Sequence, residues 1–181
     1  CDHSSTMLFT PTRTGLNNLI AEGFNLHRSA PFSPDQPGVF HCGDIMYDNS
    51  LYFSKLAESK SKILKTLKLK KEEFLLTTLH RDNNTDDVKR LKSIFEALIS
   101  ISSKHQIKIV LPLHPRTKKA MEENLDAEFL ESVVKNPLIK IIPPVSYLDI
   151  IVLEKNCKLL LTDSGGVQKE AYFFKKPSII L

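Results

Sequence analysis

The sequence has few cysteines and no long apolar run, and each absence removes a class of protein. Its three cysteines, Cys1, Cys42 and Cys157, lie far apart, so neither a disulfide framework nor a zinc-binding spacing is indicated. No apolar stretch reaches the ~20 residues that span a bilayer, and no signal-peptide pattern opens the chain. We therefore expect a cytoplasmic protein with no membrane partner.

The charge of the chain is also modest, at +4 with neutral histidines. Such a balance suits a small anionic ligand such as a phosphate ester, and it is too weak to indicate nucleic acid. The sequence holds neither a Walker loop nor a GxGxxG fingerprint, so ATP and NAD are not expected. No histidine has carboxylates at metal-ligand spacing, and we expect neither a metal nor a cofactor.

Short apolar segments alternate with amphipathic, helix-like segments over most of the chain. This pattern is typical of a parallel sheet buried on both faces. We therefore predict an α/β fold with a Rossmann-like parallel sheet and helices on both faces. The strands are expected at residues 7–9, 39–42, 74–79, 107–113, 139–142, 158–161 and 178–181, and the helices at 13–23, within 44–69, and at 87–103, 117–123, 147–154 and 167–174.

A proline-rich stretch divides the chain. Residues 27–38 contain Pro31, Pro34 and Pro37, which is the composition of a linker. We expect residues 1–38 to be the end of one domain with its linker, and residues 39–181 to be most of a second domain. The chain opens without Met, on residues typical of the middle of a helix or a loop, and its last residues, 177–181, resemble the start of a strand. Both ends are therefore expected to be cuts within a longer protein.

Polar residues follow several of the expected strands. Ligands bind beyond the carboxyl ends of the strands in a parallel sheet, so these residues should converge on one rim. The groups are residues 80–85, 114–117, 143–147 and 162–170.

The turn Asp163-Ser164-Gly165-Gly166 is the most informative of these groups. Two glycines at a strand-to-helix turn let backbone N–H groups approach a ligand, and the start of a helix carries partial positive charge. Ser164 adds a hydroxyl, and Glu170 is placed to accept hydrogen bonds from a ribose diol. The turn is a candidate seat for a pyrophosphate, although an ordinary N-cap formed by Asp163 or Ser164 explains the same residues equally well.

Two histidines also stand directly after expected strands. His80 precedes Arg81, and His114 precedes Pro115. Taken singly, His80 and Arg81 are most simply a capping or salt-bridging pair, and His114 is a histidine stacked at a strand end. Their position on the same expected rim makes a role at a ligand site the competing hypothesis.

Five motifs occur in order over nearly the whole chain. They are residues 8–12 (Leu-Phe-Thr-Pro-Thr), 43–48 (Gly-Asp-Ile-Met-Tyr-Asp), 78–81 (Thr-Leu-His-Arg), 111–117 (Leu-Pro-Leu-His-Pro-Arg-Thr) and 161–171 (Leu-Thr-Asp-Ser-Gly-Gly-Val-Gln-Lys-Glu-Ala). This ordered set resembles the non-hydrolysing UDP-N-acetylglucosamine 2-epimerases, including their UDP-2,3-diacetamido-glucuronate 2-epimerase branch. The family's two facing Rossmann-like domains, as in GT-B glycosyltransferases, imply that residues 1–38 end the N-terminal domain and that residues 39–181 form an incomplete C-terminal, UDP-binding domain.

The resemblance also implies an isomerase reaction and a set of residues. The family eliminates UDP from UDP-GlcNAc to give a glycal and adds it back as UDP-ManNAc, for surface polysaccharide synthesis. The catalytic carboxylates are expected outside this chain, which alone should not turn over. The implied partners are a UDP-sugar and a second copy in a homodimer. The implied residues are His80 for catalysis, Ser164, Gly165, Gly166, Glu170, Val145 and Ile150 for UDP, and Arg81 and His114 for a second UDP-sugar acting as activator or for substrate.

Several residues depart from the family pattern and leave the substrate open. Asn83 stands where Glu is frequent, Asp44 where Asn is frequent, and Lys175 where Gly is usual. Asp44 and Lys169 resemble the diacetamido-uronate branch. The alternatives are therefore an epimerase of a UDP-2,3-diacetamido uronic acid, a GT-B glycosyltransferase, and a non-catalytic module that binds a UDP-sugar.

Overall fold

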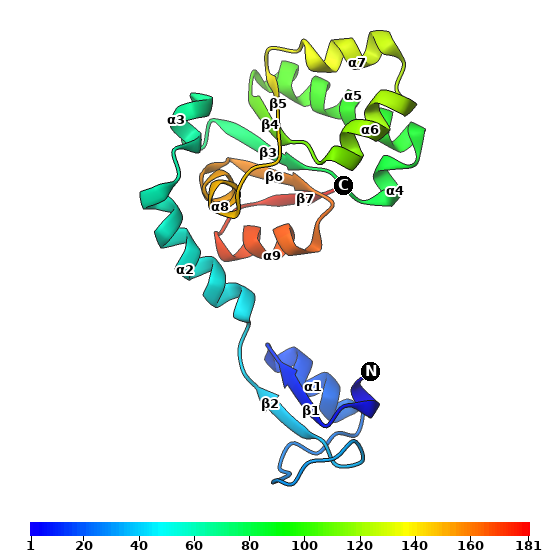
Figure 1. Cartoon of the computed structure of the whole chain (residues 1–181), viewed down its shortest axis with the longest axis vertical. Coiled ribbons are helices and arrows are strands. Elements are labelled where there is room, and N and C mark those ends of the chain that lie inside the picture. Colours follow the sequence, from blue (N-terminus) through cyan, green and yellow to red (C-terminus); the bar gives the residue numbers. More distant parts are fainter. The chain divides into compact units, whose positions relative to one another are not determined.

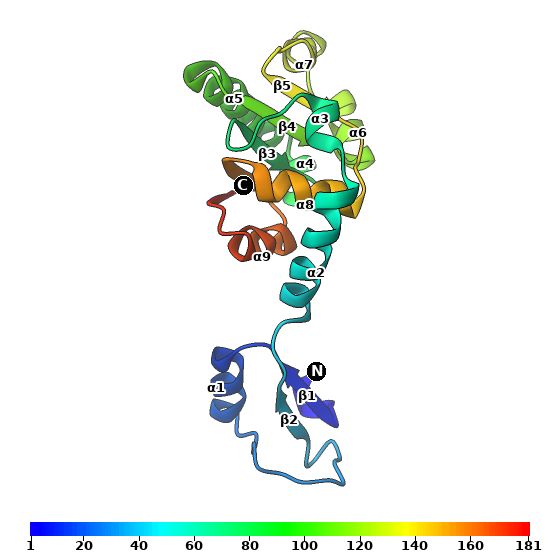
Figure 2. The same cartoon turned by 90° about the vertical axis from the view of Figure 1, so that its left-hand side faces the viewer.

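The computed structural model describes the whole chain, residues 1–181, as two compact units, Cys1–Asn49 and Ser50–Leu181. Each unit has a parallel β-sheet with its own helices (Figures 1 and 2). The first unit contains the 3-10 helix η1 (Asp2–Ser4), strand β1 (Met7–Thr10), helix α1 (Arg13–Ala21) and strand β2 (Gly38–His41).

Strands β1 and β2 of the first unit pair in parallel, from Met7 opposite Gly38 to Thr10 opposite His41. The expected domain boundary after residue 38 would separate these two strands. The compact units divide after Asn49 instead, because β2 takes its ladder hydrogen bonds from β1.

The second unit is built on a parallel sheet with the strand order β5-β4-β3-β6-β7. Helices flank this sheet on both sides (Figure 1). The strands are β3 (Phe74–Thr78), β4 (Lys108–Pro112), β5 (Ile139–Ile142), β6 (Leu159–Thr162) and β7 (Ser178–Ile180). The helices are α2 (Ile45–Lys60, in this unit from Ser50), α3 (Ile63–Leu67), α4 (Asp82–Thr85), α5 (Val88–His105), α6 (Pro115–Asn124), α7 (Ala127–Val134), α8 (Tyr147–Asn156) and α9 (Gly165–Phe173).

Both faces of the central strands are buried, because successive side chains point to opposite sides of the sheet. Leu75 and Leu161 pack in a cluster with side chains of α5, α6 and α7. Leu76 and Leu160 pack in a second cluster with side chains of α3, α8 and α9. The strands therefore read as continuous apolar runs, and the predicted Rossmann-like α/β fold is confirmed.

Two α-helices were not expected from the sequence. These are the short α4 and α7. Helix α9 also begins at Gly165, two residues before the expected start at residue 167. None of the helices is both long enough and apolar enough to cross a bilayer.

Candidate UDP site

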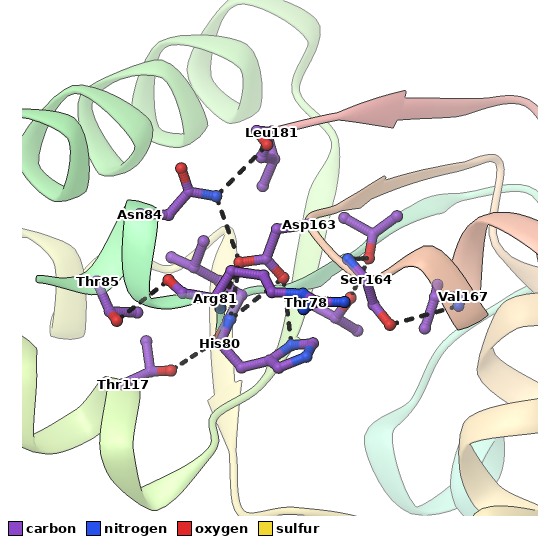
Figure 3. A network of polar contacts seen from close by, with 12 residues as sticks. Thr78, His80, Arg81, Asn84, Thr85, Thr117, Asp163, Ser164, Val167 and Leu181 are labelled. Carbon is purple, nitrogen blue, oxygen red and sulfur yellow. Dashed lines mark hydrogen bonds and ion pairs between the residues drawn. The ribbon is translucent and has the colours of Figure 1, made fainter. Parts of the chain in front are cut away.

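The carboxyl ends of β3 and β6 lie side by side, because these strands are neighbours and Thr78 stands opposite Thr162. The two threonine hydroxyls are 2.6 Å apart. The Thr162 hydroxyl also accepts a hydrogen bond from the backbone N–H of Ser164 at 3.0 Å. The register of the sheet thus brings the residues after β3 to the turn that precedes α9 (Figure 3).

Asp163 ties these two strand ends together. Its side chain is 1% exposed, and one carboxylate oxygen accepts hydrogen bonds from the backbone N–H groups of His80 at 3.0 Å and Arg81 at 2.8 Å. The Asn84 amide donates to the same oxygen at 3.3 Å. Hydrogen bonds to an ionised acceptor are among the strong ones. Asp163 therefore fixes the backbone after β3 against the start of α9 (Figure 3).

Asp163 also orients the imidazole of His80. The Nδ1 atom of His80 is 3.2 Å from the other carboxylate oxygen of Asp163. With Asp163 ionised, this contact favours the tautomer with its proton on Nδ1, which leaves Nε2 as the other functional atom. The His80 side chain is 41% exposed, so the ring is anchored at one nitrogen and still reachable from solvent.

The start of α9 presents backbone amides at this rim. Ser164 is the N-cap, and its Oγ accepts from the Val167 N–H at 3.5 Å. Gly165 follows and is exposed, and a Cβ added to it would meet no atom within 4 Å. Packing within the chain therefore does not require glycine at this position. The missing side chain leaves open space in front of a helix N-terminus, which is where anions bind.

Glu170 lies further along α9, and its residue is 9% exposed. The Tyr147 hydroxyl donates to Glu170 Oε1 at 3.4 Å. Burial raises the pKa of Glu170, and the hydrogen bond from Tyr147 opposes that rise. Val145 and Ile150 pack, partly buried, against the apolar cluster shared by α8 and α9.

Arg81 and His114 stand at the starts of other helices. Arg81 is the N-cap of α4 and has no side-chain capping bond, while Asp163 holds its backbone N–H. His114 is the N-cap of α6, and its Nδ1 accepts from the Arg116 N–H at 3.2 Å. In the neutral form its proton therefore lies on Nε2. The Thr117 hydroxyl donates to the Leu79 carbonyl at 2.6 Å and ties α6 to the end of β3.

The structure thus brings together His80, Arg81 and the turn from Asp163 to Gly165. His114 caps its own helix instead. The sequence analysis missed the part played by Asp163, Asn84 and Tyr147. The Asn84–Asp163 bond joins residues 79 positions apart and the Tyr147–Glu170 bond joins residues 23 positions apart, so neither leaves a local signal. Among histidines, cysteines and acidic residues, no group of three or more is placed to hold a metal ion.

Fold and site together define a Rossmann-like domain with a candidate anion seat at the carboxyl ends of its strands. The family model for UDP-N-acetylglucosamine 2-epimerase matches residues 1–181. The chain therefore belongs to the UDP-N-acetylglucosamine 2-epimerase family.

Relatives and solved structures agree with this assignment. A UDP-N-acetylglucosamine 2-epimerase homolog of Methanococcus maripaludis is 44% identical, with 99% of this chain and 46% of the relative covered. The UDP-2,3-diacetamido-2,3-dideoxy-D-glucuronate 2-epimerase of Pseudomonas aeruginosa is 40% identical, with 99% of this chain and 44% of the relative covered. A crystal structure of the Methanocaldococcus jannaschii UDP-GlcNAc 2-epimerase in complex with UDP-GlcNAc and UDP matches with a TM-score of 0.79 and 37% identity, over 98% of this chain and 45% of that one. The chain thus spans somewhat less than half the length of these relatives.

Proposed function

We propose that this chain forms the UDP-binding part of a UDP-N-acetylglucosamine 2-epimerase. The observation that carries the proposal is the position of Asp163, which holds His80 and the start of α9 on one rim. In this proposal the pyrophosphate lies against Ser164, Gly165 and Gly166, and Glu170 accepts hydrogen bonds from the ribose.

The reaction needs a group that stabilises charge on the departing pyrophosphate. Elimination breaks the bond between C1 and the UDP oxygen while a base removes the C2 proton, and the electron pair of that C–H bond becomes the C1–C2 double bond. His80, with Nδ1 held by Asp163, is placed to donate from Nε2 to the leaving diphosphate when it is protonated. UDP then adds back, and a proton returns to the opposite face of C2.

The remaining site residues have supporting roles in the proposal. Val145 and Ile150 supply an apolar wall for uracil, consistent with their packing beside α9. Arg81 and His114 contact substrate or a second UDP-sugar. The proposed setting is a cytoplasmic homodimer that supplies surface polysaccharide synthesis.

The proposal is tested with the full-length protein and UDP-GlcNAc in D2O, followed by NMR. Deuterium at C2 together with the manno epimer is the expected result. Sugar transfer to an added acceptor without exchange would instead indicate a GT-B glycosyltransferase. Binding with neither reaction would indicate a UDP-sugar-binding module.

A UDP-2,3-diacetamido uronic acid is the second candidate substrate. The Pseudomonas aeruginosa relative named for that substrate is 40% identical. Its identity lies between the 44% of the Methanococcus maripaludis UDP-N-acetylglucosamine 2-epimerase homolog and the 36% and 37% of two UDP-N-acetylglucosamine 2-epimerases. Competition between the two nucleotide sugars in the D2O assay decides the matter, since the true substrate has the larger kcat/KM.

A further inference from the structure

Polar groups from three helices meet around Glu170, and of these only Glu170 has a part in the proposed UDP contacts. Ser50 comes from α2, Tyr147 and Glu154 from α8, and Glu170 from α9. Tyr147 and Glu154 are about two turns apart and so lie on the same face of α8. We call these residues, Ser50, Tyr147, Glu154 and Glu170, the Glu154 cluster.

Glu154 is fully buried, with 0% of the residue exposed. Neither of its carboxyl oxygens has a hydrogen-bond partner. An ionised carboxylate in that setting is strongly destabilising, because a buried charge needs a partner. The neutral acid is accommodated far more easily.

The ionisable group that interacts electrostatically with the Glu154 carboxyl is the carboxyl of Glu170. Within the cluster, the Tyr147 hydroxyl interacts electrostatically with both carboxyls. The Ser50 hydroxyl lies near Tyr147 but outside hydrogen-bonding geometry. Lys155, the next residue on α8, is bound to Ser54 and Glu58 instead.

Other titratable groups nearby supply no positive partner to Glu154. Cys157 follows α8, and burial raises the pKa of its thiol to about 12, which leaves it neutral. Lys176, which lies near Cys157, pairs with Glu72. The charge of the cluster is therefore set by the protonation states of the Glu154 and Glu170 carboxyls.

Two carboxyls in one buried cluster resist ionising together. Burial, and then the Glu170 carboxylate, raise the pKa of Glu154 well above its usual range. Burial also raises the pKa of Glu170, but the hydrogen bond from Tyr147 works against that rise. Glu170 is therefore the first of the two to lose its proton.

We propose that Glu154 is a positioning residue that stays a neutral carboxylic acid behind Glu170, so that the negative charge resides on the carboxylate that meets the ribose. This inference rests on the proposed function, because it needs Glu170 to accept the ribose hydroxyls of UDP. When Glu154 also ionises at high pH, its negative charge repels that of the Glu170 carboxylate and disturbs the ribose contact. UDP affinity then falls.

Unfolding of the full-length protein in urea at several pH values tests the protonation without UDP. A carboxyl with a raised native pKa binds its proton more tightly when folded, so its contribution is fully present below the usual Glu pKa and is lost as pH rises toward the native value. Across that window, the unfolding equilibrium constant of the native protein should rise about tenfold per pH unit relative to Glu154→Gln. Glu131→Gln, a change at an exposed residue of α7, should follow the native protein.

UDP titration over the same pH range tests the positioning role. The native protein and Glu131→Gln should lose about tenfold in affinity at alkaline pH, the effect of about one pKa unit of coupling, whereas Glu154→Gln should keep its affinity. If Glu154→Gln does not fold, Glu154→Met provides another side chain that cannot ionise.

The possible results separate the two proposals. Equal pH slopes of unfolding for the native protein and Glu154→Gln would overturn a neutral Glu154. Different slopes with identical UDP profiles would overturn the positioning role alone. A native protein that binds no UDP at any pH would instead overturn the proposed function and the positioning role that rests on it.

Discussion

The neighbouring strands β3 and β4 are both followed by a histidine, and the two histidines are held in different ways. His80 contacts a carboxylate from another strand end, Asp163 after β6. His114 accepts a hydrogen bond from the first turn of its own helix. The first arrangement couples distant parts of the chain at one rim, whereas the second stabilises a single helix start. Of the two histidines, only His80 is held by a residue from a second strand end.

Asp163→Ala should have the largest effect, because it removes the carboxylate that holds His80 from a second strand end. The substitution leaves the His80 and Arg81 N–H groups and the Asn84 amide without their buried acceptor. We expect a loss of about 3 kcal/mol in unfolding free energy and a loss of turnover at least as large as that of His80→Ala. Urea unfolding and the D2O assay measure the two effects.

Asp86→Ala is the matched control, since the Asp86 side chain is 61% exposed and pairs with Arg116 at the surface. It should change the unfolding free energy by less than about 1 kcal/mol. An Asp163→Ala protein as stable and as active as this control would contradict the claim that Asp163 holds the site together.

His80→Ala should leave the fold intact and slow turnover by roughly two orders of magnitude, the usual effect of losing a general acid or base. Steady-state rates with UDP-GlcNAc measure it. His105→Ala, at the exposed end of α5, is the control and should be neutral. An unchanged rate in His80→Ala would exclude His80 from the chemistry.

Gly165→Ala should weaken UDP binding by about tenfold while leaving stability unchanged or slightly raised. The new methyl group meets no atom of the chain within 4 Å, and alanine favours helix over glycine by about 0.5–1 kcal/mol. It would occupy the space in which the diphosphate approaches the amides of α9. Calorimetric titration with UDP and urea unfolding provide the comparison, and unchanged UDP affinity would place the diphosphate elsewhere.

His114→Ala should have the smallest effect, a loss of about 0.5–1 kcal/mol in unfolding free energy from the missing N-cap acceptor. Turnover should change by less than about tenfold. His114→Asn restores a capping side chain without an imidazole, so it should recover the stability. A hundredfold slower His114→Ala enzyme, not rescued by Asn, would place His114 beside His80 in function.

The central strands β3, β4 and β6 were predictable from the sequence because burial on both faces of the sheet makes each of them an apolar run. Strand β5 was predicted with its observed bounds, 139–142. Helix α7 was not predicted, although its eight residues are as many as those of the helix expected at 147–154. The start of α9 was placed late because two glycines disfavour a helix interior, although they are acceptable directly after the N-cap Ser164.

The candidate site was only partly predictable for a related reason. The sequence predicted His80 and the turn at Ser164 on one rim because both directly follow strands of a parallel sheet, and the register of β3 and β6 places the two strand ends side by side. The bonds that hold them involve backbone N–H groups, which every residue except proline carries and which leave no signal in a sequence. The buried Glu154 was likewise unmarked, because its position on α8 reads as one more charged residue between Leu153 and Lys155.

The most direct test is a crystal structure of the full-length protein with UDP. The diphosphate should lie within hydrogen-bonding distance of the backbone N–H groups of Gly165 and Gly166, with His80 Nε2 facing it. A diphosphate bound away from the start of α9, with His80 turned from it, would contradict the proposed site.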